Sequence, residues 1–318
     1  MNPFAEHYTA CNTGTNAAKY AALADFPHIV DIEPAGVCNM RCLCCPTGLM
    51  AVTRPQSLMT LKTYRRILSE CAEHGTAMRF IGFGEPTLNP DLVRFVWLAD
   101  AAGLLTHLNT NGTKMSRQYT EDLFDAGLSS IKFSFQGVDR KSYKEMRRAD
   151  LYEPLMAAIR LAFDVRGHRR LPYIHVSSSI TYETPEQVSA FVESLEPYTD
   201  KVSVGRTIFD FIELDKVPAK WRADLAKAAA LSTDDKAQPN PCPEVYDKLS
   251  IHSDGTVVSC CNDYNNTNVL GNVNDTMLAE MWRAPGMEKY RARLADGDYS
   301  LPLCATCFDY AGLTEGTA

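Results

Sequence analysis

Cys38-Asn39-Met40-Arg41-Cys42-Leu43-Cys44-Cys45 is the stretch of this chain that decides its fold. Three residues separate Cys38 from Cys42, and two separate Cys42 from Cys45. A short loop with this spacing can bring three thiolates to three irons of one cubane cluster. The fourth iron is then free to bind and activate a small molecule. A zinc loop, or three free cysteines in a core, are the alternative interpretations of the same spacing.

Two strand-like segments flank this loop. The apolar stretch 29–33 precedes it, and the strand-like run 78–81 leads into Gly82-Phe83-Gly84-Glu85-Pro86. Loop and turn together resemble the radical S-adenosylmethionine (radical SAM) enzymes. The family carries a Gly-Gly-Glu-Pro turn that binds the amino group of the cofactor's methionine part. Phe83 stands where the first Gly of that turn is usual, so the backbone is less free there.

The resemblance implies specific roles for these residues. Cys38, Cys42 and Cys45 would hold a [4Fe-4S] cluster whose open iron binds S-adenosylmethionine. The cofactor would also contact Phe83, Gly84, Glu85 and Pro86. Cys44 stands where the family tends to have an aromatic residue or Met. It is either a spare thiol or a small apolar side chain, and we favour the second.

Strand-like and helix-like segments alternate from about residue 27. Strands are predicted at 29–33, 78–82, 106–110, 131–135, 174–180 and 202–206. Helices are predicted at 60–74, 90–102, 117–126, 141–147, 153–165, 185–195 and 218–231. Such alternation indicates parallel βα units. The fold class is therefore α/β, and six strands match the open, partial (β/α)6 TIM-like barrel of the radical SAM family. Ligands are expected at the carboxyl ends of the strands.

Polar residues follow or end three of the predicted strands. The family uses such positions for the ribose hydroxyls and the methionine carboxylate of the cofactor. The resemblance therefore implies cofactor contacts from Asn111, Ser134, Gln136 and Ser178. Arg147 is a further candidate, because a guanidinium matches the geometry of a carboxylate. The alternative for each of these residues is a turn or a strand cap.

A second set of cysteines lies near the end of the chain: Cys242, Cys260, Cys261, Cys304 and Cys307. Residues 251–258 predict a hairpin with an Asp-Gly turn, and a helix is expected around 277–282. This region resembles the SPASM/twitch extension of radical SAM enzymes, whose short form binds one auxiliary [4Fe-4S] cluster. The resemblance implies Cys242, Cys260, Cys304 and Cys307 as its ligands. A zinc knuckle with the same thiolates is the alternative.

These regions define the expected organisation of the chain. Residues 1–26 form an N-terminal segment that matches no known pattern. Residues 27–231 form the barrel, and residues 232–318 form a linker and the cysteine-rich extension. Cys11 and Cys71 are expected to be ordinary unpaired thiols.

Composition is ordinary for a globular protein, with 45% apolar and 22% charged residues. No apolar run is long enough to span a bilayer, and no secretory segment is visible, so we expect a cytoplasmic protein without a membrane partner. Eleven cysteines there favour metal binding or catalysis over disulfides. A net charge of −7 disfavours a nucleic-acid partner and is compatible with a cationic substrate, although solubility alone accounts for it.

The family's reaction is removal of a hydrogen atom from a substrate C–H bond by a 5′-deoxyadenosyl radical, with electrons from a donor such as flavodoxin or ferredoxin. Cys261 follows the proposed ligand Cys260 directly, so both are not expected to bind one cluster. An S–H bond is weak enough to quench a carbon radical. Cys261 is therefore our candidate catalytic residue, with the role of hydrogen donor. The alternative is that this thiol only packs against its neighbours.

Small members of this subgroup tailor aminoglycosides, and the chain resembles them. Our leading hypothesis is an epimerase acting on a cationic, aminoglycoside-like sugar with Cys261 as donor. The alternative is a dehydrogenase that oxidises an amino-cyclitol or sugar alcohol through the auxiliary cluster. Modification of a ribosomal peptide ranks lower, because 26 residues are too short for a peptide-binding domain. A further alternative is a non-enzymatic binding module with two zinc sites. We rank it lowest, because such a module would have no use for the Gly-Glu-Pro turn.

Overall fold

The computed structural model describes residues 1–232 and 241–307. The linker predicted over 232–241 lies almost wholly outside the described residues. The description below concerns only the part of the chain on either side of that gap.

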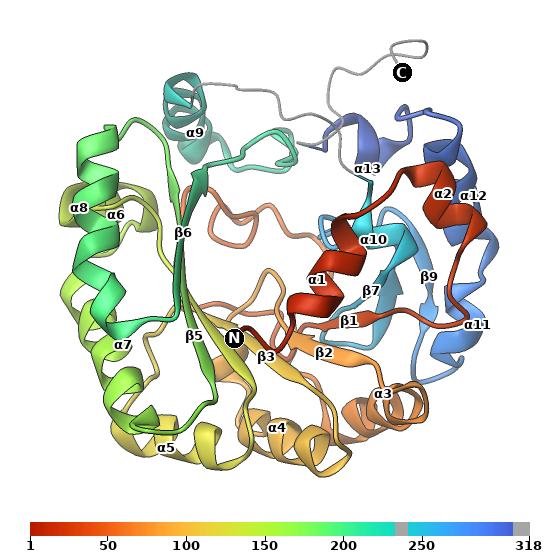
Figure 1. Cartoon of the computed structure of the whole chain (residues 1–318). Helices are drawn as coiled ribbons and strands as arrows, with labels where there is room; N and C mark the ends of the chain where they lie inside the picture. Colours follow the sequence, from red (N-terminus) through yellow and green to blue (C-terminus); the bar gives the residue numbers. More distant parts are fainter. Residues whose placement is uncertain (233–240, 308–318) are drawn as a thin grey trace.

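Six parallel strands form the barrel, in the order β6-β5-β4-β3-β2-β1. They are β1 Ile29–Ile32, β2 Ala77–Phe80, β3 Thr106–Thr110, β4 Ser130–Ser134, β5 Tyr173–Ile180 and β6 Lys201–Arg206. Each overlaps a predicted strand, and the pairing runs in register from Ile29 opposite Ala77 to Ile180 opposite Arg206. The α/β partial barrel is confirmed (Figure 1).

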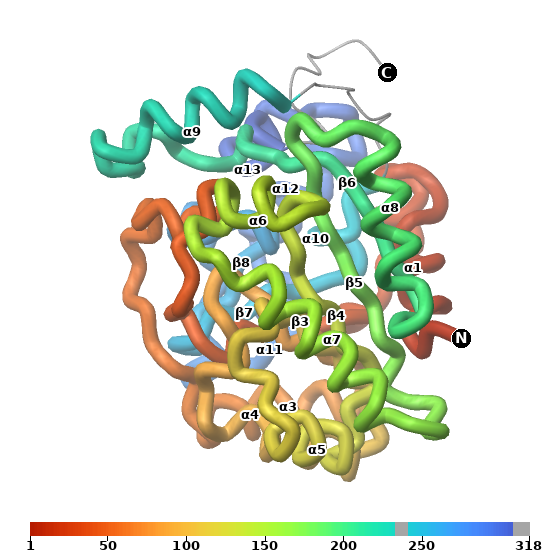
Figure 2. Tube along the Cα trace, turned by 90° about the vertical axis from the view of Figure 1, so that its left-hand side faces the viewer, coloured from red at the N-terminus to blue at the C-terminus, as the bar shows by residue number. Residues whose placement is uncertain are grey.

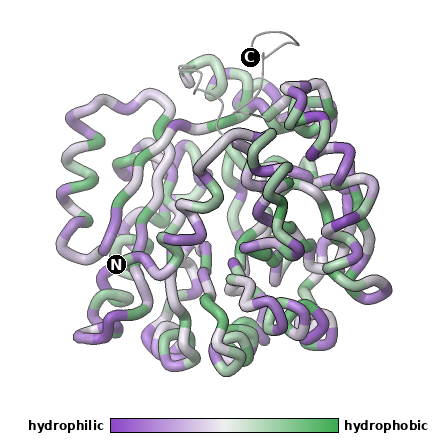
Figure 3. Tube along the Cα trace, turned by 45° about the vertical axis from the view of Figure 1, so that its right-hand side comes forward, coloured by the Kyte–Doolittle hydropathy of each residue, from purple (hydrophilic) through white to green (hydrophobic). Residues whose placement is uncertain are grey.

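Helices cover the outer face of this curved sheet (Figure 1). They are α3 Leu61–His74, α4 Leu92–Ala101, α5 Arg117–Asp125, α6 Arg140–Arg147, α7 Tyr152–Arg166 and α8 Pro185–Leu195, with single 3-10 turns at Pro86–Leu88 and Glu196–Tyr198. Hydrophilic and hydrophobic residues alternate along the outer helices (Figure 3), as expected of helices that bury one face. Two begin as predicted, because Thr60 and Thr184 accept hydrogen bonds from Thr63 N and Gln187 N.

The extension continues the barrel sheet instead of forming a separate layer. Strand β7 (Lys248–Ile251) pairs parallel to β1, and β8 (Thr256–Val258) and β9 (Val269–Asn272) follow antiparallel. The predicted Asp-Gly turn joins β7 to β8, with Gly255 at a φ of 89°. The helices of this part are α10 Pro243–Tyr246, α11 Leu278–Trp282, α12 Pro285–Ala295 and α13 Pro302–Ala305.

The N-terminal segment folds into two helices, α1 Ala5–Asn12 and α2 Asn16–Ala21, which lie beside α10 and α12 (Figure 1). Phe4 is fully buried and packs in one cluster with Ile29 and Ala77, at the amino ends of β1 and β2. Lys19 pairs with Asp247 at 2.7 Å. The segment therefore closes one end of the barrel and supports the extension.

Helix α9 (Ala219–Leu231) crosses the opposite end of the barrel, above α6 (Figure 2). A separate apolar cluster joins this helix to the cysteine loop, through Leu43 and Leu49 of the loop and Leu225 of α9. Helix α9 therefore covers the cysteine loop at this end of the barrel. Among the described residues, no helix has both the length and the apolar character needed to cross a membrane.

Candidate active site

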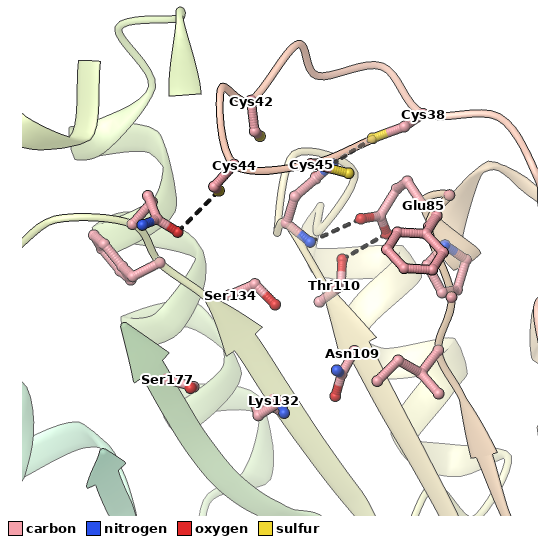
Figure 4. A pocket seen from close by; sticks show the side chains of 18 of the residues that line it. Cys38, Cys42, Cys44, Cys45, Glu85, Asn109, Thr110, Lys132, Ser134 and Ser177 are labelled. Atoms are coloured by element: carbon pink, nitrogen blue, oxygen red, sulfur yellow. Dashed lines mark hydrogen bonds between the residues drawn. The ribbon is translucent and has the colours of Figure 1, made fainter. Parts of the chain in front are cut away.

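A cavity of about 310 Å³ opens at the carboxyl ends of β2 to β5, beneath the cysteine loop (Figure 4). Its walls bring together most of the side chains predicted from the sequence: Cys38, Cys42, Cys44, Cys45, Phe83, Gly84, Glu85, Pro86, Asn111, Ser134, Gln136 and Arg147. Residues separated by a hundred positions in the chain therefore meet at one end of the barrel, as the parallel topology requires.

The cysteine loop is held by backbone hydrogen bonds. Leu43 N donates to Met146 O at 2.7 Å, and Leu49 N donates to Cys45 O at 2.9 Å. Gly48 is needed for this compact path, because a Cβ there would lie 2.2 Å from Cys42 O. The loop is thus fixed on both sides, with its thiols facing the cavity.

The donor set fits an iron–sulfur cluster. Burial raises the pKa of Cys38 to about 11 and that of Cys45 to about 12, so iron has to displace protons on binding. Residues 1–232 and 241–307 contain no group of three or more His, Cys, Asp or Glu side chains close enough to hold a single metal ion.

Glu85 is the most constrained polar group of the cavity. Its carboxylate accepts hydrogen bonds from Thr87 Oγ1 at 2.7 Å, Thr110 Oγ1 at 2.8 Å and Asn111 N at 2.8 Å. Burial raises the pKa of Glu85, and these hydrogen bonds act in the opposite direction. The carboxylate is therefore held in one orientation at the cavity wall.

The turn before Glu85 tolerates Phe83 because its backbone and ring are both supported. Phe83 N donates to Glu33 at 3.2 Å, and the ring lies 5.5 Å from that of Tyr264. Gly84 is the position that admits no side chain, since a Cβ there would lie 1.7 Å from Ala35 O. The departure from the family's usual Gly thus falls at the position where a side chain can be accommodated.

Two other predicted residues, Arg147 and Gln136, contact the cysteine loop directly. Arg147 donates to Cys42 Sγ at 3.4 Å and to the carbonyl of Ser134. Gln136 accepts a hydrogen bond from Cys44 at 3.3 Å. Cys44 also packs against the apolar cluster that contains Leu43 and Leu49, so the apolar packing that we favour for it is present together with this one polar contact.

Asn111 lies at the other side of the loop. Its amide donates to Asn39 Oδ1 at 2.9 Å and approaches Cys38 Sγ at 3.9 Å. The side chain therefore links the end of β3 to the first cysteine.

Ser178 is the candidate that the structure places outside the cavity. Its hydroxyl donates to the carbonyl of Gly137, and its neighbours Ser177 and Ser179 line the cavity instead. Successive side chains of a strand face opposite sides of the sheet, so only alternate serines can face inward. A cofactor contact from β5 would have to come from Ser177 or Ser179.

Five polar lining residues are absent from the candidates predicted from the sequence: Asn109, Thr110, Lys132, Ser177 and Ser179. The signal for Lys132 is its place between Ile131 and Phe133, which are both buried in the main core. That alternation directs Lys132 to the barrel interior.

The second cysteine set gathers from three segments. Burial and the neighbouring Cys307 raise the pKa of Cys304 to about 12. Burial raises the pKa of Cys242 well above its usual value, and a hydrogen bond with Cys261 together with burial raises that of Cys260. The four predicted auxiliary ligands are Cys242, Cys260, Cys304 and Cys307.

Cys261 is exposed and lines a second cavity of about 210 Å³. This cavity and the first share the wall formed by Ile81, Gly82 and Phe83. Cys261 N donates to Glu244 at 3.4 Å. The thiol thus lies on the side of the shared wall that faces the extension.

Residues 32–195, more than half of the chain, match the radical SAM superfamily. The chain belongs to that superfamily. Residues 242–308 match SPASM, an iron–sulfur cluster-binding domain. This radical SAM enzyme therefore uses S-adenosylmethionine (AdoMet) and a [4Fe-4S] cluster, and its SPASM domain implies auxiliary iron–sulfur binding.

Curated relatives of this radical SAM enzyme differ in activity. A PqqA peptide cyclase of Bradyrhizobium diazoefficiens is 34% identical over 113 residues, which is 36% of this chain and 30% of the relative. A GTP 3′,8-cyclase of Mannheimia succiniciproducens is 28% identical over 163 residues, 50% of this chain and 48% of the relative. The matches thus span less than half of these relatives.

Solved structures resemble almost the whole fold. BtrN in complex with AdoMet and 2-DOIA has a TM-score of 0.55 at 15% identity, covering 86% of this chain and 88% of BtrN. Streptococcus suis SuiB bound to precursor peptide SuiA has a TM-score of 0.67 at 18% identity, covering 90% of this chain and 70% of SuiB. At these identities the likeness concerns the fold alone.

Proposed function

We propose that this radical SAM enzyme is an epimerase of a small polyhydroxylated substrate, with Cys261 as the hydrogen donor. Cys38, Cys42 and Cys45 would hold the first cluster, and Cys242, Cys260, Cys304 and Cys307 the auxiliary one. AdoMet and the first cluster, when bound, supply the radical that removes a hydrogen atom from the substrate.

The observation that carries this proposal is the wall shared by the two cavities. A substrate beside Gly82 and Phe83 would have the cysteine loop on one side and Cys261 on the other. Hydrogen removal from one face and return from the opposite face inverts a stereocentre. The new C–H bond forms as the Cys261 S–H bond breaks, and the thiol needs one electron and one proton before the next turnover.

The other cavity residues position the reactants. Phe83, Gly84, Glu85 and Pro86, with Asn111, Ser134, Gln136 and Arg147, would contact AdoMet. The aromatic wall formed by buried Tyr264 and half-buried Phe83 and Phe211 would keep water and competing hydrogen donors from the reacting carbon. The electron donor would be a flavodoxin or a ferredoxin.

A dehydrogenase is the second candidate, and the position of Cys260 favours it. Cys260 precedes the cavity-lining Cys261, so an auxiliary cluster there would lie near the substrate and could accept an electron. Peptide modification is a third candidate, which the resemblance to PqqA peptide cyclases and to peptide-bound SuiB supports.

The test is turnover of the anaerobically reconstituted enzyme with AdoMet and reductant in deuterated water, read by mass spectrometry. Neomycin-type aminoglycosides, sugar alcohols and uronic acids would be offered in parallel. An isomeric product with one solvent deuterium, lost in Cys261→Ala while 5′-deoxyadenosine still forms, is the expected result. A product two mass units lighter without label would favour the dehydrogenase, and inversion by Cys261→Ala would overturn the role of Cys261.

A further inference from the structure

Lys132 lies inside the barrel, where the mechanism above gives it no role. It stands on β4 directly opposite Asn109 of β3 and His175 of β5, and it lines the first cavity. Figure 4 shows it between Asn109 and Ser177, on the side of the cavity away from the cysteines. A cation at this place faces whatever fills the floor of the cavity.

Two other cations near Lys132, Arg79 and Lys248, are neutralised by carboxylates, and Lys132 is not. Arg79 pairs with Asp31, and Lys248 pairs with Glu244 at 2.6 Å. Within residues 1–232 and 241–307, the Lys132 ammonium has neither a hydrogen bond nor an ion pair. Burial, together with the charge of Arg79, lowers the pKa of Lys132 to about 8, so the group still carries its proton at neutral pH.

The walls beside Lys132 offer hydrogen-bond donors. His107 Nε2 lies 2.7 Å from Asn109 Oδ1, and burial lowers the pKa of His107 well below its usual value. In the neutral tautomer with its proton on Nε2, His107 donates to that oxygen and leaves the Asn109 N–H groups for the cavity. The hydroxyl of Ser177 faces the same space.

We propose that Lys132, Asn109 and Ser177 bind a carboxylate of the substrate at the floor of the cavity. One cation with neutral donors matches a single negative charge, whereas a phosphate dianion calls for more positive charge. This inference deepens the proposed function and rests on it: the substrate is an acidic polyhydroxylated molecule. It replaces the cationic sugar of the leading hypothesis, because the charged groups of this cavity are Lys132, Arg147 and the fully hydrogen-bonded Glu85.

The carboxylate of AdoMet is a poor match for this place. Gln136, which contacts Cys44, lies four residues beyond Lys132 and past the end of β4 at Ser134. The two strand residues from Lys132 to Ser134 already rise about 7 Å, so the cysteine loop lies further than that above the lysine. A cofactor carboxylate held at the cysteine loop cannot also reach the floor. The group at Lys132 therefore belongs to a second molecule.

The experiment measures the thermal unfolding midpoint of the reconstituted enzyme with AdoMet and one of three probes. The probes are D-glucuronate, D-glucose and D-glucosamine, which share a ring and differ in charge. At about tenfold its dissociation constant, glucuronate should raise the midpoint by about 2 °C, and the other two should not. Lys132→Met should lose this shift, whereas Lys62→Met, which removes an exposed lysine of the outer helix α3, should keep it.

Three outcomes would overturn the proposal: stabilisation by glucosamine, no stabilisation by glucuronate, or an unchanged shift in Lys132→Met. A tenfold weaker AdoMet affinity in Lys132→Met would also overturn it, because the lysine would then serve the cofactor. A failure of the proposed epimerase reaction can be distinguished from a failure of the carboxylate site. Cys261→Ala should keep the glucuronate shift, so absence of solvent deuterium in the product would remove the epimerase assignment and leave the carboxylate site standing.

Discussion

The two cysteine sets of this enzyme are built in opposite ways. The barrel set lies within eight residues, 38–45, of a single loop that two backbone hydrogen bonds anchor. The extension set draws Cys242, Cys260, Cys304 and Cys307 from three separate segments, and Cys242 N donates to Asn16 of the N-terminal segment at 2.8 Å. The thiols of a local set come together when one loop adopts its conformation. The thiols of a dispersed set come together only when much of the tertiary structure has formed.

The largest expected effect tests the local set. Cys42→Ala should lower the iron content from about eight to about four per chain, because one of three ligands to the first cluster is lost. AdoMet cleavage should fall below detection. Iron analysis and 5′-deoxyadenosine formation measure both effects.

Cys44→Ala is the matched control, since its thiol lines the same cavity and contacts Gln136. It should keep about eight irons and AdoMet cleavage. Equal iron loss in both variants would show that Cys44 is a ligand.

The second prediction tests whether the dispersed set forms independently. Cys304→Ala should lose about four irons and still cleave AdoMet without substrate turnover, because the barrel loop does not contain this residue. Cys261→Ala, beside a proposed ligand, should retain all of the iron. Loss of both clusters in Cys304→Ala would mean that the barrel site depends on the extension.

The third prediction concerns the ion pair that joins the two regions. Arg54, which follows the cysteine loop, binds Glu33 of the barrel at 2.7 Å and donates to Tyr264 O of the extension at 3.0 Å. Arg54→Met leaves the buried Glu33 carboxylate without its cation, with only the hydrogen bonds from Phe83 N and Ser253 N, and should cost about 3–5 kcal/mol of unfolding free energy. Arg117→Met, which removes an exposed pair with Glu121, should cost under about 1 kcal/mol in the same denaturant titration. Equal losses would contradict a special role for the buried pair.

The difference between local and dispersed structure also explains what the sequence could predict. The six barrel strands and the bounds of α3 depend on neighbours in the chain, and the sequence predicts them to within two residues. The parallel pairing of β7 with β1 joins Ile29 to Lys248. The burial of Phe4 against Ala77 is also a long-range contact. Contacts between segments far apart in the chain produce no periodic pattern in the sequence of either segment.

The candidate site divides in the same way. The thiols of Cys38, Cys42 and Cys45 could be placed because their spacing is short. Ser178 was misplaced because the alternation of buried Ile174 and Val176 was not extended into the run of three serines, where it puts Ser178 on the face that packs against the helices. Lys132 was visible in principle, between Ile131 and Phe133, once their burial against the helices is known.

The smallest expected effect sharpens the comparison most directly. Asn16→Ala removes the acceptor of the Cys242 N–H and should destabilise that segment by about 1 kcal/mol, which corresponds to roughly fivefold faster amide exchange. Exchange around Leu43, whose N–H bonds to Met146 O in the barrel loop, should not change, and Asn12→Ala, which removes an exposed bond to Tyr8 O, should alter neither region. Hydrogen-exchange mass spectrometry resolves the two regions. Faster exchange in both regions would mean that the N-terminal helices stabilise the whole molecule. A change confined to the extension means that the dispersed cysteine set depends on a segment more than two hundred residues away. In that case the local set does not depend on that segment.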